Sequence, residues 1–379
     1  MALTHFDTTT NLRVTRQDPR VWLYGQSNTF FGKFVGPMGK ARKNDSGDGV
    51  IIETSANAIV QLSMEFTKAK GDRVTVPLRV PLYSAGVTAD GDLEGTEEEL
   101  TFHDFSFELK STGHAVRGSG DLSDRRVAFN VKGQAKEALT EWMGRQIDYY
   151  VLCAMSGLAT PDGNVAAVAP AATRRWIGGQ TAAGVVAKVA ALEDLNVATD
   201  YLFGPQVITT VKRMAQLSVP KVRPVTIGGK DHYVMFIHPY QVKALKATTE
   251  WGQIHQNASV RGEKNPIFTG ALGMYDNVWL HEWERIETRD GDGAGIETYF
   301  DAGDAGTPLD ATIDAARALF CGAQSVIEAF GRTPRALAKQ FDYNRKWGVG
   351  MDCHLAVAKP VFDSLDYGVI AVDTCIVPD

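Results

Sequence analysis

The sequence predicts an α+β fold built from two or three structural units, and three observations lead to this prediction. Two segments that alternate polar and apolar residues flank an acidic stretch, which indicates a long β-hairpin. A later segment carries apolar residues at the three- and four-residue spacing of a long amphipathic helix. The second half mixes short strand-like and helix-like runs. At 379 residues the chain is also long for a single compact core.

The overall composition is that of an ordinary folded protein, with 44% hydrophobic and 22% charged residues. A formal net charge of -6 argues against a protein whose main task is gripping nucleic acid, although it leaves room for loose local contact with DNA. Cys153, Cys321, Cys353 and Cys375 are far apart and form no C-x-x-C pair, so we expect interior thiols and a reducing compartment. With no signal-peptide profile and no apolar run of spanning length, we expect a soluble protein made inside a cell.

The first element is a basic arm. Between Arg13 and Lys43 lie seven Lys and Arg residues and one acidic residue, Asp18, so the segment carries 7 minus 1, or +6. Glycines and prolines interrupt it, and its apolar residues follow no regular period. We therefore expect an extended arm that lies on another surface through aromatic anchors. These anchors are Trp22, Tyr24, Phe30, Phe31 and Phe34.

The second element is the hairpin. Residues 73–80 and 101–109 alternate as strands do, and the stretch from Ser84 to Glu108 holds eight acidic residues and no Lys or Arg, a charge of -8. A tip this polar does not pack into a core, so we expect it to project. A plain solvated loop is the alternative.

Helices follow the hairpin. Val131 to Leu158 is the strongest helical pattern and would be roughly 40 Å long. Gly144 inside it costs about 1 kcal/mol relative to Ala, so packing must hold the helix together. Ala182 to Leu195 predicts a weaker amphipathic helix, and Leu202 to Leu217 another that Pro220 ends.

The second half predicts a mixed unit. His232 to His238 is a strand pattern that runs into Pro239, which suits the first turn of a helix. Ile313 to Phe330 is apolar enough to be buried, and we expect Gly331 and Pro334 to break it. The remaining patterns are a strand at 277–283, a Gly/Asp-rich loop at 290–307, and two closing β-like runs at 353–361 and 367–377.

Searches for catalytic motifs fail. The glycine-containing segment Gly36 to Ala41 lacks the Ser or Thr that holds magnesium in a phosphate-binding loop. No G-x-S-x-G occurs, and His281-Glu282 is not followed by a second His one helical turn later. The best metal candidate, the loop from Asp290 to Asp301, has no oxygen ligand at Ala294. The chain therefore shows no recognisable active site, and we predict no catalytic, cofactor-binding or metal-binding residues.

Several segments together resemble a known family. Lys70-Gly-Asp with the following Val-Thr-Val-Pro-Leu strand, and then the run from Leu93 to Leu100, resemble the extended-loop segment of Enquatrovirus-type (coliphage N-four-like) phage major capsid proteins. Later motifs agree in order and spacing. They are Ile237-His-Pro-Tyr-Gln, the run from Asn265 to Asp276, and the run from Tyr367 to Thr374. The likeness extends from about Ala56 to Thr374.

The resemblance implies the major capsid fold of tailed phages, with a defined order of parts. Residues 1–63 would be the N-terminal arm and 64–129 the extended loop with its flanking strands, which overlaps a neighbouring subunit. Residues 130–192 would form the peripheral domain with its spine helix, 193–327 the axial domain, and 328–379 the return strands of the peripheral domain.

The resemblance also implies a function. The chain would be a structural, non-enzymatic virion protein that self-assembles into hexamers and pentamers of an icosahedral head around double-stranded DNA. Its expected partners are copies of itself, a portal, a separate scaffolding protein, a decoration protein and, non-specifically, DNA, with assembly in the host bacterial cytoplasm and no membrane. Two alternatives stay open: an encapsulin-like nanocompartment shell, and a metal-dependent enzyme that uses the Asp290 loop and the histidines.

Residues that gain burial only against a neighbour are the candidate inter-subunit contacts. Our hypothesis is that the acidic hairpin tip docks on basic surface of an adjacent copy, either on the arm or on three arginines that follow the hairpin. The candidates are Trp22, Phe30, Phe31, Arg42, Lys43, Asp90, Asp92, Glu94, Glu97, Glu98, Glu99, Arg117, Arg125 and Arg126.

Overall fold

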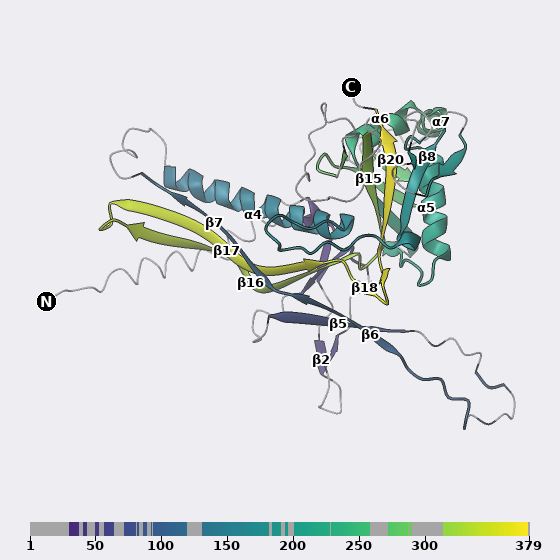
Figure 1. Ribbon diagram of the computed structural model, residues 1–379, viewed down its shortest axis with the longest axis horizontal. Helices are drawn as coiled ribbons and strands as arrows, with labels where there is room; N and C mark the ends of the chain where they lie inside the picture. Colours follow the sequence, from purple (N-terminus) through teal and green to yellow (C-terminus); the bar gives the residue numbers. More distant parts are fainter. Residues whose placement is uncertain are drawn as a thin grey trace.

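The computed structural model shows an elongated subunit with a compact unit at one end and two projecting β-ribbons (Figure 1). No helix in the part of the chain that it describes is both long and apolar enough to cross a membrane. The described residues are 30–37, 41–43, 50–52, 57–63, 72–80, 82, 86–88, 92, 94–119, 131–181, 184–190, 194–195, 201–227, 229–257, 272–286, 288–289 and 314–377.

The compact unit is built on a nine-stranded mixed sheet in the order β12-β13-β11-β15-β20-β8-β9, with β10 and β14 added beside β11 and β15. Its central strands are buried on both faces, which explains their nearly continuous apolar sequences. Helices α5 (Pro205–Leu217) and α6 (Pro239–Ala247) pack on one face. The strands are β8 (Arg175–Gln180), β9 (Val186–Lys188), β10 (Val225–Ile227), β11 (Lys230–Ile237), β12 (Gly273–Tyr275), β13 (Val278–Glu282), β14 (Thr288–Arg289), β15 (Asp314–Cys321) and β20 (Val369–Ile376).

The elongated unit is a five-stranded sheet in the order β1-β4-β16-β17-β7. Its long strands β16 and β17 pair from Ile327 opposite Ala358 out to Phe341 opposite Lys346, and this ribbon extends to the left in Figure 1. Helix α4 packs on the ribbon and, near its C-terminal end, on β15. The strands are β1 (Val35–Pro37), β4 (Val60–Ser63), β7 (Lys110–Arg117), β16 (Val326–Phe341) and β17 (Lys346–Ala358).

Helix α4 (Val131–Ser156) confirms the long helix predicted from the sequence. It buries Leu139, Met143 and Ile147, which recur one turn apart, and its internal Gly144 is buried too. The helix ends at Gly157, whose φ of 82° is a left-handed conformation that glycine adopts at little cost. From there the chain turns back towards β8.

The predicted hairpin is also confirmed. Strands β5 (Arg73–Arg79) and β6 (Phe102–Glu108) pair antiparallel along their full length, and the ribbon projects away from both units at the lower right of Figure 1. The helix predicted over Leu202 to Leu217 forms as α5, which begins at Pro205, and the helix expected to begin at Pro239 forms as α6. Helix α7 spans Thr249–Asn257. The remaining short elements are η1 (Phe31–Lys33), β2 (Ala41–Lys43), β3 (Val50–Ile52), η3 (Ala172–Arg174), β18 (Val361–Phe362) and β19 (Leu365–Asp366).

Two expectations are wrong. The helix predicted over Ala182 to Leu195 is absent from the described residues 184–190: Gly184 turns with a φ of 80°, and β9 pairs antiparallel with β8 at the edge of the large sheet. Gly331 and Pro334 do not end the apolar run either. Strand β16 continues through both, and the pairing with β17 shifts register on either side of Arg332, so the two residues produce bulges.

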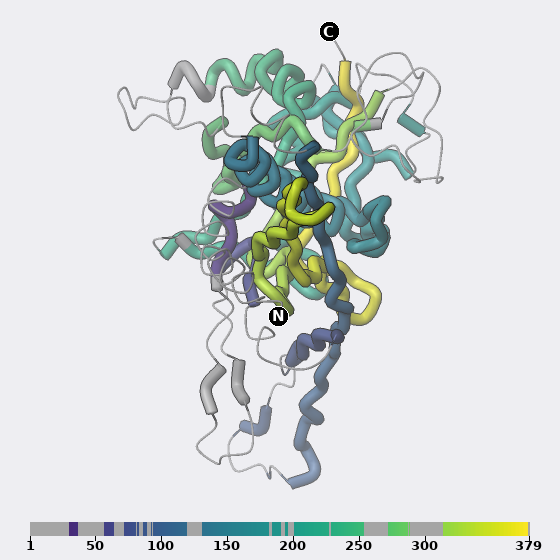
Figure 2. Tube along the Cα trace, turned by 90° about the vertical axis from the view of Figure 1, so that its left-hand side faces the viewer, coloured from purple at the N-terminus to yellow at the C-terminus, as the bar shows by residue number. Residues whose placement is uncertain are grey.

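All four cysteines are free and buried, as expected for interior thiols. The tube view in Figure 2 shows that the hairpin and the compact unit lie at opposite ends of the subunit's vertical axis. The hairpin tip is therefore remote from the apolar cores of its own chain.

Candidate self-association surfaces

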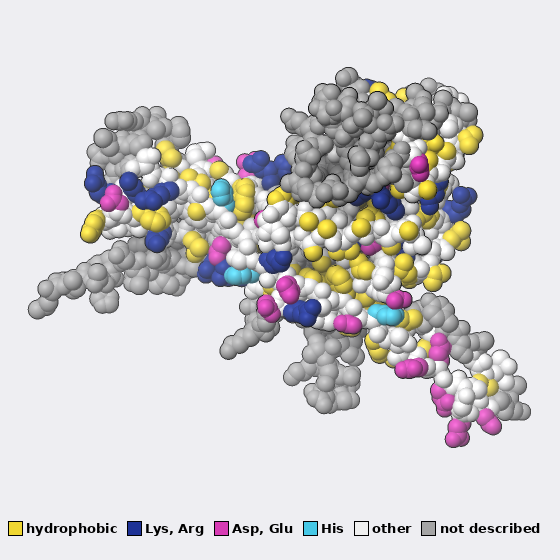
Figure 3. Space-filling view, viewed as in Figure 1, with side chains coloured by type: hydrophobic (Ala, Val, Ile, Leu, Met, Phe, Trp, Pro, Cys, Tyr) yellow, Lys and Arg dark blue, Asp and Glu magenta, His cyan; other side chains and the backbone are white. Residues whose placement is uncertain are grey.

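The hairpin tip is an acidic surface. Residues 94–100 are all exposed, and the acidic side chains along the tip gather at the lower right of Figure 3. One local contact shapes it, since the backbone N–H of Gly95 donates to Glu97 Oε2 at 2.7 Å. The described acidic residues of the tip are Asp92, Glu94, Glu97, Glu98 and Glu99.

The same ribbon exposes apolar side chains. Val74 is the one fully buried residue of β5 and β6, whereas Leu82, Leu100 and Phe102 are 60%, 48% and 59% exposed. Phe105 at the root contacts Phe362 of β18, with ring centroids 6.1 Å apart. In an isolated subunit the hairpin therefore buries little apolar surface. The exposed apolar side chains of the hairpin are available to a partner.

A polar network joins helix α4 to β7, the strand that follows the hairpin. The Tyr150 hydroxyl lies 3.0 Å from Thr112 Oγ1 of β7 and donates to Asp162, and Asn164 Nδ2 donates to the Tyr150 hydroxyl at 2.7 Å. Burial and then the Asp162 carboxylate raise the pKa of Tyr150 to about 12, so the phenol keeps its proton. Beside this network, Arg73, Phe107 and Lys359 contribute to the lining of a cavity of about 280 Å³.

A basic surface occupies the far end of the β16–β17 ribbon. The guanidinium of Arg117 lies 4.3 Å from the centre of the Phe341 ring, and Lys339 Nζ lies 5.2 Å from the same ring. Arg345 and Lys346 follow the turn, and Lys346 is 3.8 Å from the carboxylate of Asp342. Four basic residues against one acidic residue give this end +3, and dark blue side chains cluster there in Figure 3.

Tyr343 lies at the tip of this ribbon and is 100% exposed, and Leu337 is 40% exposed. This end was not among the sequence-based contact candidates, apart from Arg117. The sequence does carry a turn signal there, because Asp and Asn in the run Asp342-Tyr343-Asn344 favour tight turns. In the structure all three residues adopt positive φ. We define the basic end by Arg117, Lys339, Arg345 and Lys346.

Two aromatic residues of the predicted arm lie inside their own subunit. Phe31 is 1% exposed, and Phe30 stacks on Trp283 with ring centroids 4.6 Å apart. The backbone N–H groups of Phe30 and Phe31 donate to the Asp148 carboxylate of α4 at 2.8 and 3.1 Å. A side chain buried like Phe31 has no surface left for a neighbour, so we no longer regard it as a contact candidate.

The structure brings some candidates together and leaves others undescribed. Asp92, Glu94, Glu97, Glu98 and Glu99 share the hairpin tip, whereas Arg117 lies at the basic end. Arg42 and Lys43 belong to β2, whose side chains are outside the described set. Trp22, Asp90, Arg125 and Arg126 lie outside the described residues altogether.

The described residues contain no group of three or more His, Cys, Asp or Glu side chains arranged to hold a metal ion. His238 caps helix α6 by accepting the Tyr240 N–H at Nδ1, and burial lowers its pKa to about 4, so this imidazole is a neutral structural group. His281 contacts the Phe34 ring at 5.0 Å. The loop from Asp290 to Asp301 lies outside the described residues.

Comparisons with known proteins agree on one family. The family model described as phage capsid protein matches residues 24–377. A major capsid protein of Pseudomonas phage KPP25 is 26% identical over 97% of this chain and 96% of its own length. Among solved structures, the capsid of Ralstonia phage GP4 matches with a TM-score of 0.69 and 25% identity, covering 89% of this chain and 93% of that one. The cyanophage Pam1 capsid has the same fold, with a TM-score of 0.69, 21% identity and 92% coverage of both chains. The chain therefore belongs to the phage capsid protein family and has the α+β fold of phage head shells.

Proposed function

We propose that the chain is the major capsid protein of an Enquatrovirus-type tailed phage and that it closes into hexamers and pentamers of an icosahedral head around double-stranded DNA. The family match over residues 24–377 carries the head-shell role. The charge arrangement of the single subunit supports its closure into rings. An acidic hairpin tip projects from one side, and a basic end terminates a ribbon on the other. Such a subunit is complementary to its own copy in a head-to-tail contact, and head-to-tail contacts form closed rings when the rotation closes.

The parts of the subunit take corresponding roles in this proposal. Residues 1–63 act as the N-terminal arm and 64–129 as the extended loop that overlaps a neighbour. Residues 130–192 and 328–379 form the peripheral domain, and 193–327 form the axial domain that meets its copies at ring centres. Strands β8, β9 and β20 are the exception: they pair within the nine-stranded sheet that holds β11 and β15, so we assign them to the axial domain. Phe31 is buried within its own subunit, so we assign it no contact with a neighbour.

Electrostatics orients the contact, and apolar burial strengthens it. Exposed charge pairs contribute about 0–1 kcal/mol each and act mainly on orientation and association rate. Burying Leu82, Leu100 and Phe102 against a neighbour adds about 25 cal/mol for each Å² removed from water. The charges of the tip thus select the partner surface, and burial of the apolar side chains of the ribbon stabilises the contact.

The remaining partners follow from the proposed role. A phage head needs a portal, and we infer a separate scaffolding protein, a decoration protein and non-specific contact with the packaged DNA. Assembly takes place in the host bacterial cytoplasm. The chain has a structural and not an enzymatic role, in keeping with the failed motif searches and with a family of structural proteins.

The first test removes the tip charge while keeping its shape. Replacing Glu97, Glu98 and Glu99 together by Gln should slow shell assembly and flatten its salt dependence, because the steering field is lost. Light scattering against salt concentration, with negative-stain microscopy of the products, measures both effects.

The matched control removes three exposed acidic residues elsewhere, by the changes Glu137→Gln, Asp231→Asn and Glu282→Gln. The control changes net charge equally and should assemble like the wild type. Wild-type assembly rates at low salt for the Glu97-Glu98-Glu99 variant would disprove the electrostatic docking. A small, well-behaved oligomer of the wild-type protein under all salt conditions would overturn the shell function itself.

A further inference from the structure

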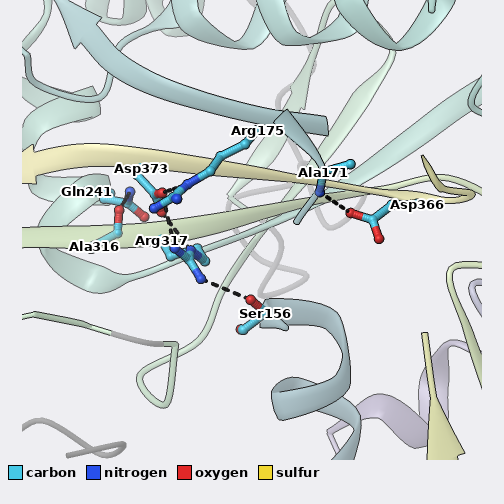
Figure 4. Close-up of polar contacts among 8 residues, drawn as sticks. All are labelled: Ser156, Ala171, Arg175, Gln241, Ala316, Arg317, Asp366 and Asp373. Atoms are coloured by element: carbon cyan, nitrogen blue, oxygen red, sulfur yellow. Dashed lines mark hydrogen bonds and ion pairs between the residues drawn. The ribbon is translucent and has the colours of Figure 1, made fainter. Parts of the chain in front are cut away.

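A buried ion cluster lies where helix α4 meets the nine-stranded sheet, drawn close up in Figure 4. Its centre is Arg317 of β15, which is 6% exposed. Arg317 Nε donates to Asp373 Oδ1 of β20 at 2.7 Å, and Arg317 Nη1 donates to the backbone carbonyl of Ser156, the last residue of α4, at 2.9 Å. One guanidinium therefore joins the end of the helix to two central strands of the sheet.

Arg317 and Arg175 share the carboxylate of Asp373, the anion of this cluster. Asp373 is 2% exposed, and its Oδ2 also accepts from Arg175 Nε of β8 at 2.7 Å. Burial alone would raise the pKa of Asp373, but Arg317 and Arg175 lower it below its ordinary value. Next to it on β20, Thr374 Oγ1 accepts from Gln241 Nε2 of α6 at 2.8 Å. The cluster thus links α4, three strands and α6.

A second buried pair holds the segment that leaves α4. Lys359 and Asp366 lie 2.9 Å apart, with side chains only 1% and 2% exposed. Lys359 Nζ donates to the carbonyl of Val168 at 3.0 Å, and Asp366 Oδ2 accepts the N–H of Ala171 at 3.1 Å. The chain between α4 and β8 is therefore fixed near the point where it enters β8.

The apolar contacts at the same junction do not fix the orientation of α4 relative to the sheet. Helix α4 touches β15 through side chains such as Met155 and Cys321, whose sulfur atoms are 3.9 Å apart. Apolar burial is non-directional and tolerates small rotations, whereas a fork of charged hydrogen bonds holds only one arrangement. Buried ion pairs contribute little net stability, because desolvation offsets the attraction, and their best-attested role is to specify geometry.

We propose that Arg317 and Asp373 are positioning residues that set the angle of α4, and of the ribbon packed on it, relative to the nine-stranded sheet. Neighbouring subunits meet through both units in a shell, so this angle also sets shell curvature. The angle is a property of the single subunit, whereas its effect on curvature rests on the proposed shell function.

The test separates geometry from stability. The double variant Arg317→Met with Asp373→Leu removes the pair and keeps apolar volume. Arg175 also loses its carboxylate partner, but its side chain is 26% exposed and can be solvated by water, so the melting temperature should stay within a few degrees of that of the wild type. Spin labels on Glu141→Cys of α4 and Arg213→Cys of α5, both exposed, report the distance between the two units by pulsed electron resonance. The four native cysteines are buried and should stay unlabelled. The wild type should give one narrow distance distribution and the double variant a distribution at least twice as wide.

A control uses a matching pair inside the ribbon. Arg332→Met with Asp352→Leu removes an ion pair of the same residue types between β16 and β17, and the distance distribution should stay narrow. If the double variant at Arg317 and Asp373 does not fold, Arg317→Lys replaces it, because an ammonium keeps the charge but loses the planar fork. A distribution as narrow as the wild type in the folded variant disproves the positioning role.

The shell gives the second readout. Shells assembled from the double variant should show a broader spread of diameters by electron microscopy than wild-type shells. Uniform shells of wild-type diameter, alongside a widened subunit distribution, would disprove the link to curvature while leaving the positioning role intact. Failure of the wild type to form any shell would count against the proposed function and would leave the subunit measurement valid.

Discussion

At the scale of single residues, the most unusual group is Glu328 of β16. It is 2% exposed, and its Oε1 has no hydrogen-bond partner among the described residues. Burial, and then the negative charge of Asp148, raise the pKa of Glu328 to about 8. Cys353 of the neighbouring strand also faces it, and the described part of β4, Val60–Ser63, brings no ionisable side chain. Glu328 therefore carries a proton in the folded protein at neutral pH.

This protonation predicts how stability depends on pH. Between the ordinary pKa of a glutamate and about 8, the folded chain holds a proton that the unfolded chain has released. The contribution of Glu328 to the free energy of unfolding is thus complete at low pH. It falls by roughly 1.4 kcal/mol per pH unit as the pH rises to about 8. The change Glu328→Gln should remove that fall.

Urea denaturation from pH 5 to pH 9 measures the effect. Between pH 5 and pH 8 the free energy of unfolding of the wild type should fall by about 3–4 kcal/mol relative to that of the variant. Glu141→Gln, on the exposed face of α4, is the control and should leave the pH profile unchanged. Parallel profiles for the wild type and the Glu328 variant would contradict a neutral Glu328.

At the scale of elements, the end of helix α4 depends on one glycine. A Cβ at Gly157 would lie 2.3 Å from the carbonyl oxygen of Val168, and φ there is 82°. Gly157→Ala should therefore destabilise the protein by about 2–4 kcal/mol, through steric overlap added to left-handed backbone strain. Thermal unfolding measures the loss.

Gly163 provides the matched comparison. It also has a positive φ of 68°, but a Cβ there meets nothing within 4 Å. Gly163→Ala should cost only the backbone penalty, about 1 kcal/mol. Equal losses for the two variants would show that the contact with Val168 contributes nothing.

At the scale of the whole molecule, the acidic tip and the basic end predict a charge-swap experiment. Reversing Glu97, Glu98 and Glu99 to Lys should block assembly, because like charges then meet across the proposed contact. Reversing Lys339, Arg345 and Lys346 to Glu in the same chain should restore it. Sedimentation of assembled shells gives the measurement.

A second set of reversals serves as the control for this rescue. Arg213→Glu, Lys221→Glu and Lys246→Glu change the same number of exposed charges on the compact unit. Combined with the reversed tip, they should not restore assembly. Rescue by both sets would mean that net charge, and not the basic end, governs the contact.

Much of the subunit follows from local sequence patterns. Period-two alternation predicts the β5–β6 hairpin, and three- and four-residue spacing predicts α4, because side-chain direction repeats with the backbone geometry of each element. The exposure of the acidic tip follows equally from the sequence, since uncompensated charges such as Glu97 to Glu99 do not enter a core. These features depend only on neighbouring residues.

Other features depend on contacts between distant segments, and only the tertiary structure decided them. Gly331 and Pro334 interrupt a strand pattern locally, yet β16 continues because β17 pairs with it on both sides of the bulges. Phe31 belongs to a free arm by composition, but its ring packs against Phe236 and Trp283 in the core. The basic end and the Arg317–Asp373 pair likewise join strands far apart in the chain. Single-chain periodicity carries no information on such pairings, because long-range packing and not local geometry selects them.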